Sequence, residues 1–85
     1  MTKVVGRRPD EVEKAQFNDC VGVLVRQKRK ERGFGCVELA TAVGVADTTL
    51  SKIESGLYPC PLFVLVRIAM ALDCDLDDLV PADWS

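Results

Sequence analysis

The sequence predicts an all-α protein in which five helices form one domain. Apolar residues recur at intervals of three and four in several segments, as expected for helices with one buried face. Glycine or proline separates these segments, and a chain of 85 residues suits a single domain. Hydrophobic residues make up 48% of the chain, which is enough for a small core.

The first predicted helix reaches residue 32 and has two possible starts. Its apolar face from Phe17 onward comprises Phe17, Cys20, Val21, Leu24 and Val25. Pro9 and the acidic residues after it also favour a helix start, so the helix begins either near residue 9 or near Phe17. We therefore divide the chain into an N-terminal arm or helix extension (1–16) and a folded domain (17–85).

Residues 36–55 form the stretch around which the chain is organised. Leu39, Ala40 and Val43 precede Gly44 at helical spacing, and Leu50 and Ile53 follow it. A glycine at this point favours a left-handed C-terminal cap. We expect helices over about 35–43 and 47–55, with Phe34 in the core and Gly56 as the second cap. Two short helices joined by a tight turn are typical of a helix-turn-helix, whose second helix enters the DNA major groove in nucleic-acid binders.

Residues 62–72 predict a nearly apolar fourth helix. Its expected core set is Leu62, Leu65, Val66, Ile68, Ala69 and Leu72. Phe63, Met70 and, less clearly, Val66 form a second stripe that one helix at the edge of a domain cannot bury, which predicts a partner surface and a homodimer. A fifth helix over about 76–80 starts after Asp75 and ends before Pro81. Trp84 either folds back on the core or joins the dimer surface.

Charge is unevenly distributed along the chain. The net charge is −2, but residues 1–56 hold ten Lys and Arg against eight Asp and Glu, whereas residues 57–85 hold one against five. Local charge sets the potential at a phosphate contact, so the first part is the one suited to DNA. The basic end of the first helix, which includes Lys28, either offsets the helix dipole or faces phosphates. Residues 1–9 are more simply interpreted as a disordered terminus than as a DNA-tracking arm.

The residue types present argue against catalysis and cofactors. The chain has no histidine and no phosphate-binding GxxxxGK motif, and its four cysteines lack zinc-site spacing. We therefore expect no enzyme activity, no metal and no small-molecule cofactor. No apolar run has the length of a transmembrane span or a signal peptide, so we expect a cytoplasmic protein without membrane contact.

Four segments together resemble the lambda-repressor and Cro-like helix-turn-helix proteins of the XRE family. They are VRQKRKERG, ELATAVGV, TLSKIESG and LVRIAMALDCDLDDLV, within residues ~17 to ~80. The resemblance implies a compact five-helix domain that binds double-stranded operator DNA as a dimer and regulates transcription. It also implies an ion pair between Arg29 and Glu54, linking the first helix to the end of the recognition helix.

The resemblance assigns DNA-contacting roles to the third helix and its surroundings. The outer positions of that helix are Asp47, Thr48, Ser51 and Lys52, with Thr49 nearby. Many relatives start the second helix with Ser or Thr followed by Gln, where this chain has Gly35 and Cys36, so only backbone amides can meet a phosphate there. Tyr58 lies in the loop after Gly56, which is often rich in Lys and Arg in relatives. This chain has Leu57 and Tyr58 there instead, which predicts few phosphate contacts.

Two functional hypotheses remain. The first is a sequence-specific regulator, most simply a repressor, that binds a two-fold related operator as a dimer. The alternative is a protein-interaction module of the same fold, antitoxin-like or an anti-regulator, with weak or no DNA binding. Asp47 bears on both, because a carboxylate can read a cytosine amino group but more commonly starts a helix. We favour the helix-starting role for this residue.

Overall fold

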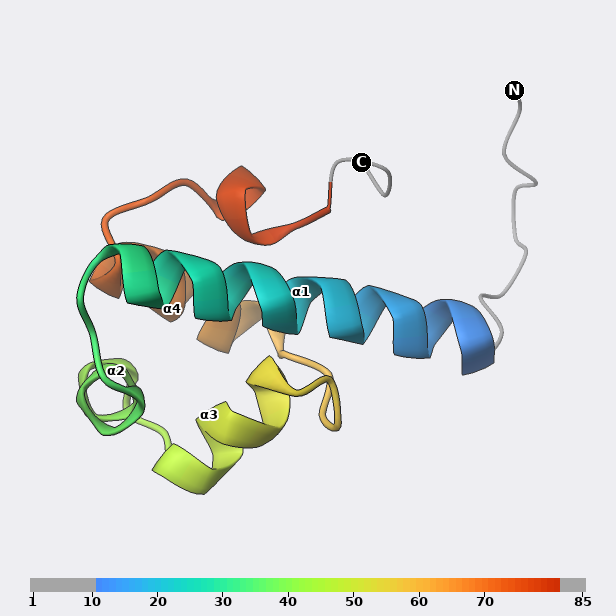
Figure 1. The fold of residues 1–85 in the computed structure, drawn as a ribbon, viewed down its shortest axis with the longest axis horizontal. Helices are drawn as coiled ribbons and strands as arrows, with labels where there is room; N and C mark the ends of the chain where they lie inside the picture. The colour runs from blue at the N-terminus through green and yellow to red at the C-terminus, as the bar shows by residue number, and fades with distance from the viewer. Residues whose placement is uncertain (1–10, 82–85) are drawn as a thin grey trace.

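The computed structural model describes residues 11–81, and all regular secondary structure in this range is helical. Figure 1 shows a long central helix with the shorter helices arranged around it. The α-helices are α1 (Glu11–Glu31), α2 (Cys36–Val43), α3 (Asp47–Glu54) and α4 (Leu62–Ala71), and a short 3₁₀ helix, η1, covers Leu76–Leu79. Trp84, which we predicted to join the core or the dimer surface, lies outside the described residues.

Helix α1 is continuous from Glu11 to Glu31, which decides between the two predicted starts. From Glu11 onward the segment before Phe17 is helical, so no fresh helix begins at Phe17. The helix ends before Gly33, whose φ of +77° is readily adopted only by glycine. Of the predicted apolar face, Val21 and Val25 are buried and Phe17 packs against the core, but Cys20 is exposed.

Every described helix contributes to one hydrophobic core. The fully buried side chains are mostly aliphatic, and they include Val25 of α1, Leu39 of α2, Leu50 of α3, Ile68 of α4 and Leu79 of η1. Phe34 packs against this core, and Ala40 is buried as predicted. None of the helices in the described part of the chain is long and apolar enough to cross a bilayer.

Two residues predicted for the α4 core are exposed instead. Leu62 is 67% exposed and Val66 is 40% exposed, whereas Leu65, Ile68, Ala69 and Leu72 are buried as expected. Buried positions at spacings of three and four define a single face of α4. Leu62 and Val66 fall on the outer face, beside Phe63 and Met70.

The predicted fifth α-helix is a single 3₁₀ turn, so residues 11–81 contain four α-helices rather than five. Only five residues separate Asp75 from Pro81, too few for a stable α-helix. The backbone amides of Asp78 and Val80 donate to carbonyl oxygens three residues back, which is the 3₁₀ pattern. The carboxylate of Asp78 accepts a hydrogen bond from the Asp75 N–H at 3.1 Å and fixes the start of the turn.

A glycine allows α1 and α3 to cross closely. A side chain at Gly22 would overlap the carbonyl oxygens of Ile53 and Glu54, so the backbones meet without an intervening side chain. Sequence periodicity placed Gly22 within a helix but did not indicate this contact. The crossing holds the end of α3 directly against the middle of α1.

Candidate nucleic-acid interface

Helices α2 and α3 form a helix-turn-helix with the predicted glycine turn. Gly44 has a φ of +91°, and its N–H donates to the Ala40 carbonyl at 2.8 Å. The N–H of Val45 donates to the same carbonyl at 3.0 Å. This left-handed cap ends α2 and lets the chain turn sharply into α3 (Figure 1).

Helix α3 has one buried face and one exposed face. Leu50 and Ile53 point into the core and are almost inaccessible to solvent. Four of the five predicted DNA-contacting residues on the helix are exposed, and Thr49 is half-buried. The exposed ones are Asp47, Thr48, Ser51 and Lys52. The outer face therefore carries hydroxyl and ammonium groups, which hydrogen-bond base edges and phosphates. It also carries a carboxylate, which can accept from a base amino group but is repelled by phosphates.

The ion pair between Arg29 and Glu54 is present and is bidentate. Arg29 Nε lies 2.7 Å from Glu54 Oε2, and Arg29 Nη2 lies 3.0 Å from Glu54 Oε1. The third guanidinium nitrogen donates to the Phe34 carbonyl at 3.0 Å. Both side chains are about one-tenth exposed or less. The hydrogen bond to Glu54 raises the pKa of Arg29 above its ordinary value, and burial opposes this shift.

Lys52 and Tyr58 contact each other beside α3. Lys52 Nζ donates to the Tyr58 hydroxyl at 3.3 Å and lies 4.9 Å from the centre of its ring. The Leu57 and Tyr58 amides both donate to the Lys52 carbonyl, which holds the loop against the helix end. A cation over an aromatic face is attracted to the ring electrons. Tyr58 therefore sets where the Lys52 ammonium lies, a role that the sequence did not indicate.

The starts of α2 and α3 are close together. Cys36 Sγ lies 3.9 Å from the Asp47 carbonyl oxygen. At α2, the Gly35 N–H donates to the Glu38 carboxylate at 2.7 Å, so an internal anion already occupies this helix start. At α3, the Asp47 carboxylate accepts from the Thr48 N–H at 3.0 Å, which suits the helix-starting role we favoured for it.

Lys28 is separated from the other predicted contact residues. Its ammonium lies 3.2 Å from the Glu31 carboxylate, one turn along α1. Burial raises the pKa of the Cys74 thiol, and Lys28 and Arg32 oppose that rise, which places both cations near the segment between α4 and η1. This segment and α3 lie on opposite sides of α1 (Figure 1). Lys28 therefore does not extend the α3 surface.

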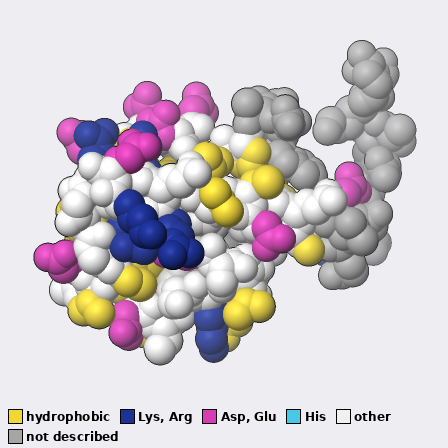
Figure 2. All heavy atoms as spheres, in the orientation of Figure 1, with side chains coloured by type: hydrophobic (Ala, Val, Ile, Leu, Met, Phe, Trp, Pro, Cys, Tyr) yellow, Lys and Arg dark blue, Asp and Glu magenta, His cyan; other side chains and the backbone are white. Residues whose placement is uncertain are grey.

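The charged groups on one face of the molecule are mixed rather than uniformly basic. Figure 2 shows Lys and Arg side chains gathered over the carboxyl-terminal half of α1, with Asp and Glu side chains around them. The described part of the chain contains no group of three or more Cys, Asp and Glu side chains that could hold a metal ion. Any ligand at this face must be recognised through hydrogen bonds and scattered charges.

The outer face of α4 carries four large exposed hydrophobic side chains. Phe63 is 69% exposed and Met70 is 76% exposed, and Leu62 and Val66 extend the same stripe. The Arg67 guanidinium lies 5.2 Å from the centre of the Phe63 ring. Exposed apolar patches of this kind are typical of contact surfaces between proteins.

Comparison with known proteins supports the architecture described above. A family model for a helix-turn-helix domain matches residues 21–82. The chain is 41% identical over 59 residues to the ImmF control region 10 kDa protein of Bacillus phage phi105, covering 69% of this chain and 66% of that protein. It is 36% identical over 61 residues to the HTH-type transcriptional regulator SinR of Bacillus subtilis, covering 71% of this chain and 55% of that one. The chain thus spans about half to two thirds of these relatives.

Two solved structures have the same helical arrangement. SinR in complex with DNA aligns with a TM-score of 0.65 and 37% identity, over 69% of this chain and 95% of that chain. The restriction-modification controller protein C.AhdI from Aeromonas hydrophila aligns with a TM-score of 0.71 over 73% of this chain and 94% of that chain. Its identity of 24% supports the fold alone. Because the family model covers most of the chain and the helix-turn-helix geometry is present, the chain belongs to the XRE-type helix-turn-helix family of transcriptional regulators.

Proposed function

We propose that this protein is a cytoplasmic, sequence-specific DNA-binding repressor that acts as a dimer and has no catalytic activity. The proposal rests on the exposed outer face of α3. Its hydroxyl and ammonium groups project from a helix whose inner face is fixed by the core and by the Arg29–Glu54 pair. The likeness to SinR, a regulator solved in complex with DNA, supports DNA binding by this chain.

In the proposed complex, α3 lies in the major groove. Thr48 and Ser51 hydrogen-bond to base edges, and Lys52 contacts a base or a phosphate. Tyr58 holds the Lys52 ammonium at the groove edge. The start of α2 contributes little to phosphate binding, because the Glu38 carboxylate already accepts from the Gly35 N–H. Binding therefore depends on few phosphates and is less salt-sensitive than that of strongly basic repressors.

Dimerisation through the apolar stripe on α4 accounts for binding to a two-fold related site. The stripe comprises Leu62, Phe63, Val66 and Met70, all exposed in the single chain. A two-fold interface uses the same patch on both copies. The two α3 helices then reach half-sites about one helical turn apart, roughly 34 Å.

Fluorescence anisotropy with DNA from upstream of the protein's own gene tests the proposal. We expect saturable binding that exceeds binding to scrambled DNA. Thr48→Ala removes one base contact and lowers specific affinity by about tenfold, which corresponds to ~1.4 kcal/mol and lies within the range of a base contact. Thr41→Ala, on the exposed side of α2, is the matched control and leaves affinity unchanged. Specific binding that is unchanged by Thr48→Ala, Ser51→Ala and Lys52→Ala would contradict the proposed site.

A protein-interaction module of the same fold is the second candidate. The exposed carboxylate of Asp47 at the start of α3 favours it, because this group is repelled by phosphates. The exposed α4 stripe would then bind a different protein. Phosphate contacts are strongest at low salt, so an absence of DNA binding at low salt would support this candidate over the repressor.

A further inference from the structure

Two basic side chains near the end of α1 are exposed and have no anionic partner. Arg26 and Lys30 lie one helical turn apart, and neither makes an ion pair or a side-chain hydrogen bond with any other described residue. The other basic residues of this segment are engaged: Lys28 and Arg29 form ion pairs, and Arg32 donates to a backbone carbonyl. Like charges one turn apart on a helix repel each other, so an external anion would stabilise this pair.

The contacts between α1 and α3 show which way these two residues face. Gly22 of α1 meets the Glu54 carbonyl, and the Arg29 guanidinium binds the Glu54 carboxylate. Arg26 lies four residues after Gly22 and three before Arg29, and residues at these spacings share one face of a helix. Lys30 follows Arg26 by four residues and extends the same row. Both cations are therefore on the side of α1 that faces the end of α3.

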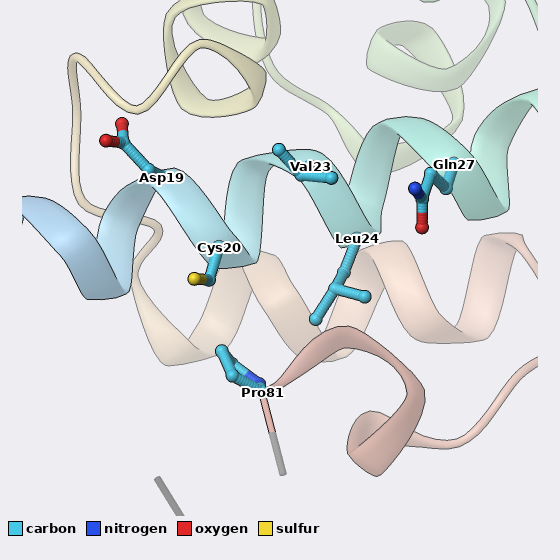
Figure 3. Close-up of a pocket in the computed structure, with 6 residues that line it drawn as sticks. All are labelled: Asp19, Cys20, Val23, Leu24, Gln27 and Pro81. Carbon is cyan, nitrogen blue, oxygen red and sulfur yellow. The ribbon is translucent and has the colours of Figure 1, made fainter. Parts of the chain in front are cut away.

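The opposite side of α1 faces η1 and the segment before it. In Figure 3, Leu24 extends toward the side on which Pro81 lies, and both residues line an apolar groove of about 410 Å³. Arg32, just after α1, is also on this side, because its guanidinium donates to the Asp73 carbonyl at 3.1 Å. Figure 1 shows α3 across α1 from this segment. Arg32 is thus an exposed cation that lies away from α3.

The length of α3 brings its carboxyl-terminal end to an edge of the major groove. Its eight residues extend about 12 Å, and the major groove is about 12 Å wide. When α3 lies in the groove, the phosphates of one strand are therefore close to the end of the helix that Glu54 fastens to α1. This strand passes the side of α1 that carries Arg26 and Lys30.

We infer that Arg26 and Lys30 bind phosphates of the DNA strand that borders the groove occupied by α3. The inference rests on the proposed function and adds a second helix, α1, to the DNA-binding surface. Phosphate contacts fix the orientation of a protein on the duplex but do not read the sequence. The two residues therefore raise the affinity for any duplex, while α3 provides the discrimination between sequences.

The salt dependence of DNA binding by the full chain tests this inference. Arg26→Gln and Lys30→Gln each remove one charge, and each should reduce the slope of the logarithm of the association constant against the logarithm of salt concentration by about 0.9. The double variant should reduce the slope by about 1.8. Affinity for upstream DNA and for scrambled DNA should fall by the same factor, because phosphate contacts do not depend on sequence.

The double variant Lys14→Gln/Arg32→Gln is the matched control. It also removes two exposed charges, one from the first turns of α1 and one from the η1 side, and so changes the net charge by the same amount. We expect its slope to equal that of the unmodified protein. Far-UV circular dichroism verifies that all variants are folded.

Equal slopes for the two double variants would overturn the inference, because the effect would then report net charge alone. So would a slope that Arg26→Gln/Lys30→Gln leaves unchanged, or a loss of affinity confined to upstream DNA, which would indicate base contacts. In these cases the unmodified protein still binds upstream DNA specifically, and the proposed function stands. An unmodified protein that does not bind DNA even at low salt would instead remove the proposed function and this inference together.

Discussion

Arg29 and Glu54 are separated by 25 positions in the sequence and joined by two parallel hydrogen bonds, of 2.7 Å and 3.0 Å. The same guanidinium also donates to the Phe34 carbonyl, just before α2. One side chain therefore links α1, the start of α2 and the end of α3. This link fixes the position of α3 relative to the rest of the domain.

Removing one partner of this pair should destabilise the protein strongly. Arg29→Met or Glu54→Leu leaves one charge unpaired at a site about one-tenth exposed, and each should cost ~3–5 kcal/mol at the buried extreme. The double variant should cost less than the sum, because it leaves no unpaired charge. Urea unfolding measures these free energies.

Lys28→Ala breaks the exposed Lys28–Glu31 pair and is the control, with a cost of ~1 kcal/mol or less. Additive costs at Arg29 and Glu54 would contradict the coupling.

Gly22→Ala should lower stability although alanine is the better helix former. The added methyl group would overlap the carbonyl oxygens of Ile53 and Glu54, which are backbone atoms and cannot turn aside. Overpacking of this kind costs about 1–3 kcal/mol, more than the ~1 kcal/mol gained in helix propensity. Thermal unfolding followed by circular dichroism measures the change. An increase in Tm would show that α1 and α3 do not meet at this glycine.

The Cys60 thiol should make stability fall between pH 9 and 11. Burial raises the pKa of this thiol from 9.0 to about 11. Below pH 9 the folded and unfolded chains both keep the proton, so this group has no effect on stability. Between the two values the unfolded chain loses the proton first, so the unfolded state is favoured as pH rises.

The test compares urea unfolding of the unmodified protein with that of Cys60→Ala across this pH range. The difference in unfolding free energy between the two should change above pH 9 and be constant below it. A difference that is constant throughout would mean that the thiol titrates alike in both states.

The α4 stripe should drive self-association. Phe63→Glu or Met70→Glu places a charge on a surface that is about 70% exposed in the single chain. Sedimentation equilibrium should show a dimer for the unmodified protein and a monomer for both variants, because a buried unpaired charge is costly at an interface. Val37→Glu on α2 serves as the control and should remain dimeric. A protein that is monomeric at high concentration would remove the dimer from the proposed function.

Periodicity predicted the helices with long apolar stripes well. The segments around Leu39 and Leu50 fold as expected, and the left-handed turn at Gly44 follows from a glycine placed directly after a stripe. The Arg29–Glu54 pair was predicted from the resemblance to the XRE family. Spacing alone does not indicate it, because the two residues belong to different helices. The expected boundary between residues 16 and 17 stays a prediction.

The errors arose where sequence pattern lacks three-dimensional information. In an almost entirely apolar helix, periodicity does not distinguish the buried face from the outer one. Leu62 was therefore assigned to the core wrongly, and Val66, which was given to both faces, lies on the outer one. The 3₁₀ turn at Leu76–Leu79 has helix-capping residues on both sides but too few residues between them for an α-helix. The phosphate contact proposed for Lys28 stays a prediction; in the structure its ammonium pairs with Glu31 at 3.2 Å.

The salt dependence of DNA affinity tests the use of α3 most directly. The logarithm of the association constant should fall linearly with the logarithm of salt concentration, and Lys52→Ala should reduce the slope by about 0.9, the loss of one phosphate contact. Lys14→Ala removes an equal charge from the first turns of α1, away from α3. This control should leave the slope unchanged. Equal slopes for the unmodified protein and Lys52→Ala, with equal affinities, would contradict the account that α3 is the surface that meets DNA.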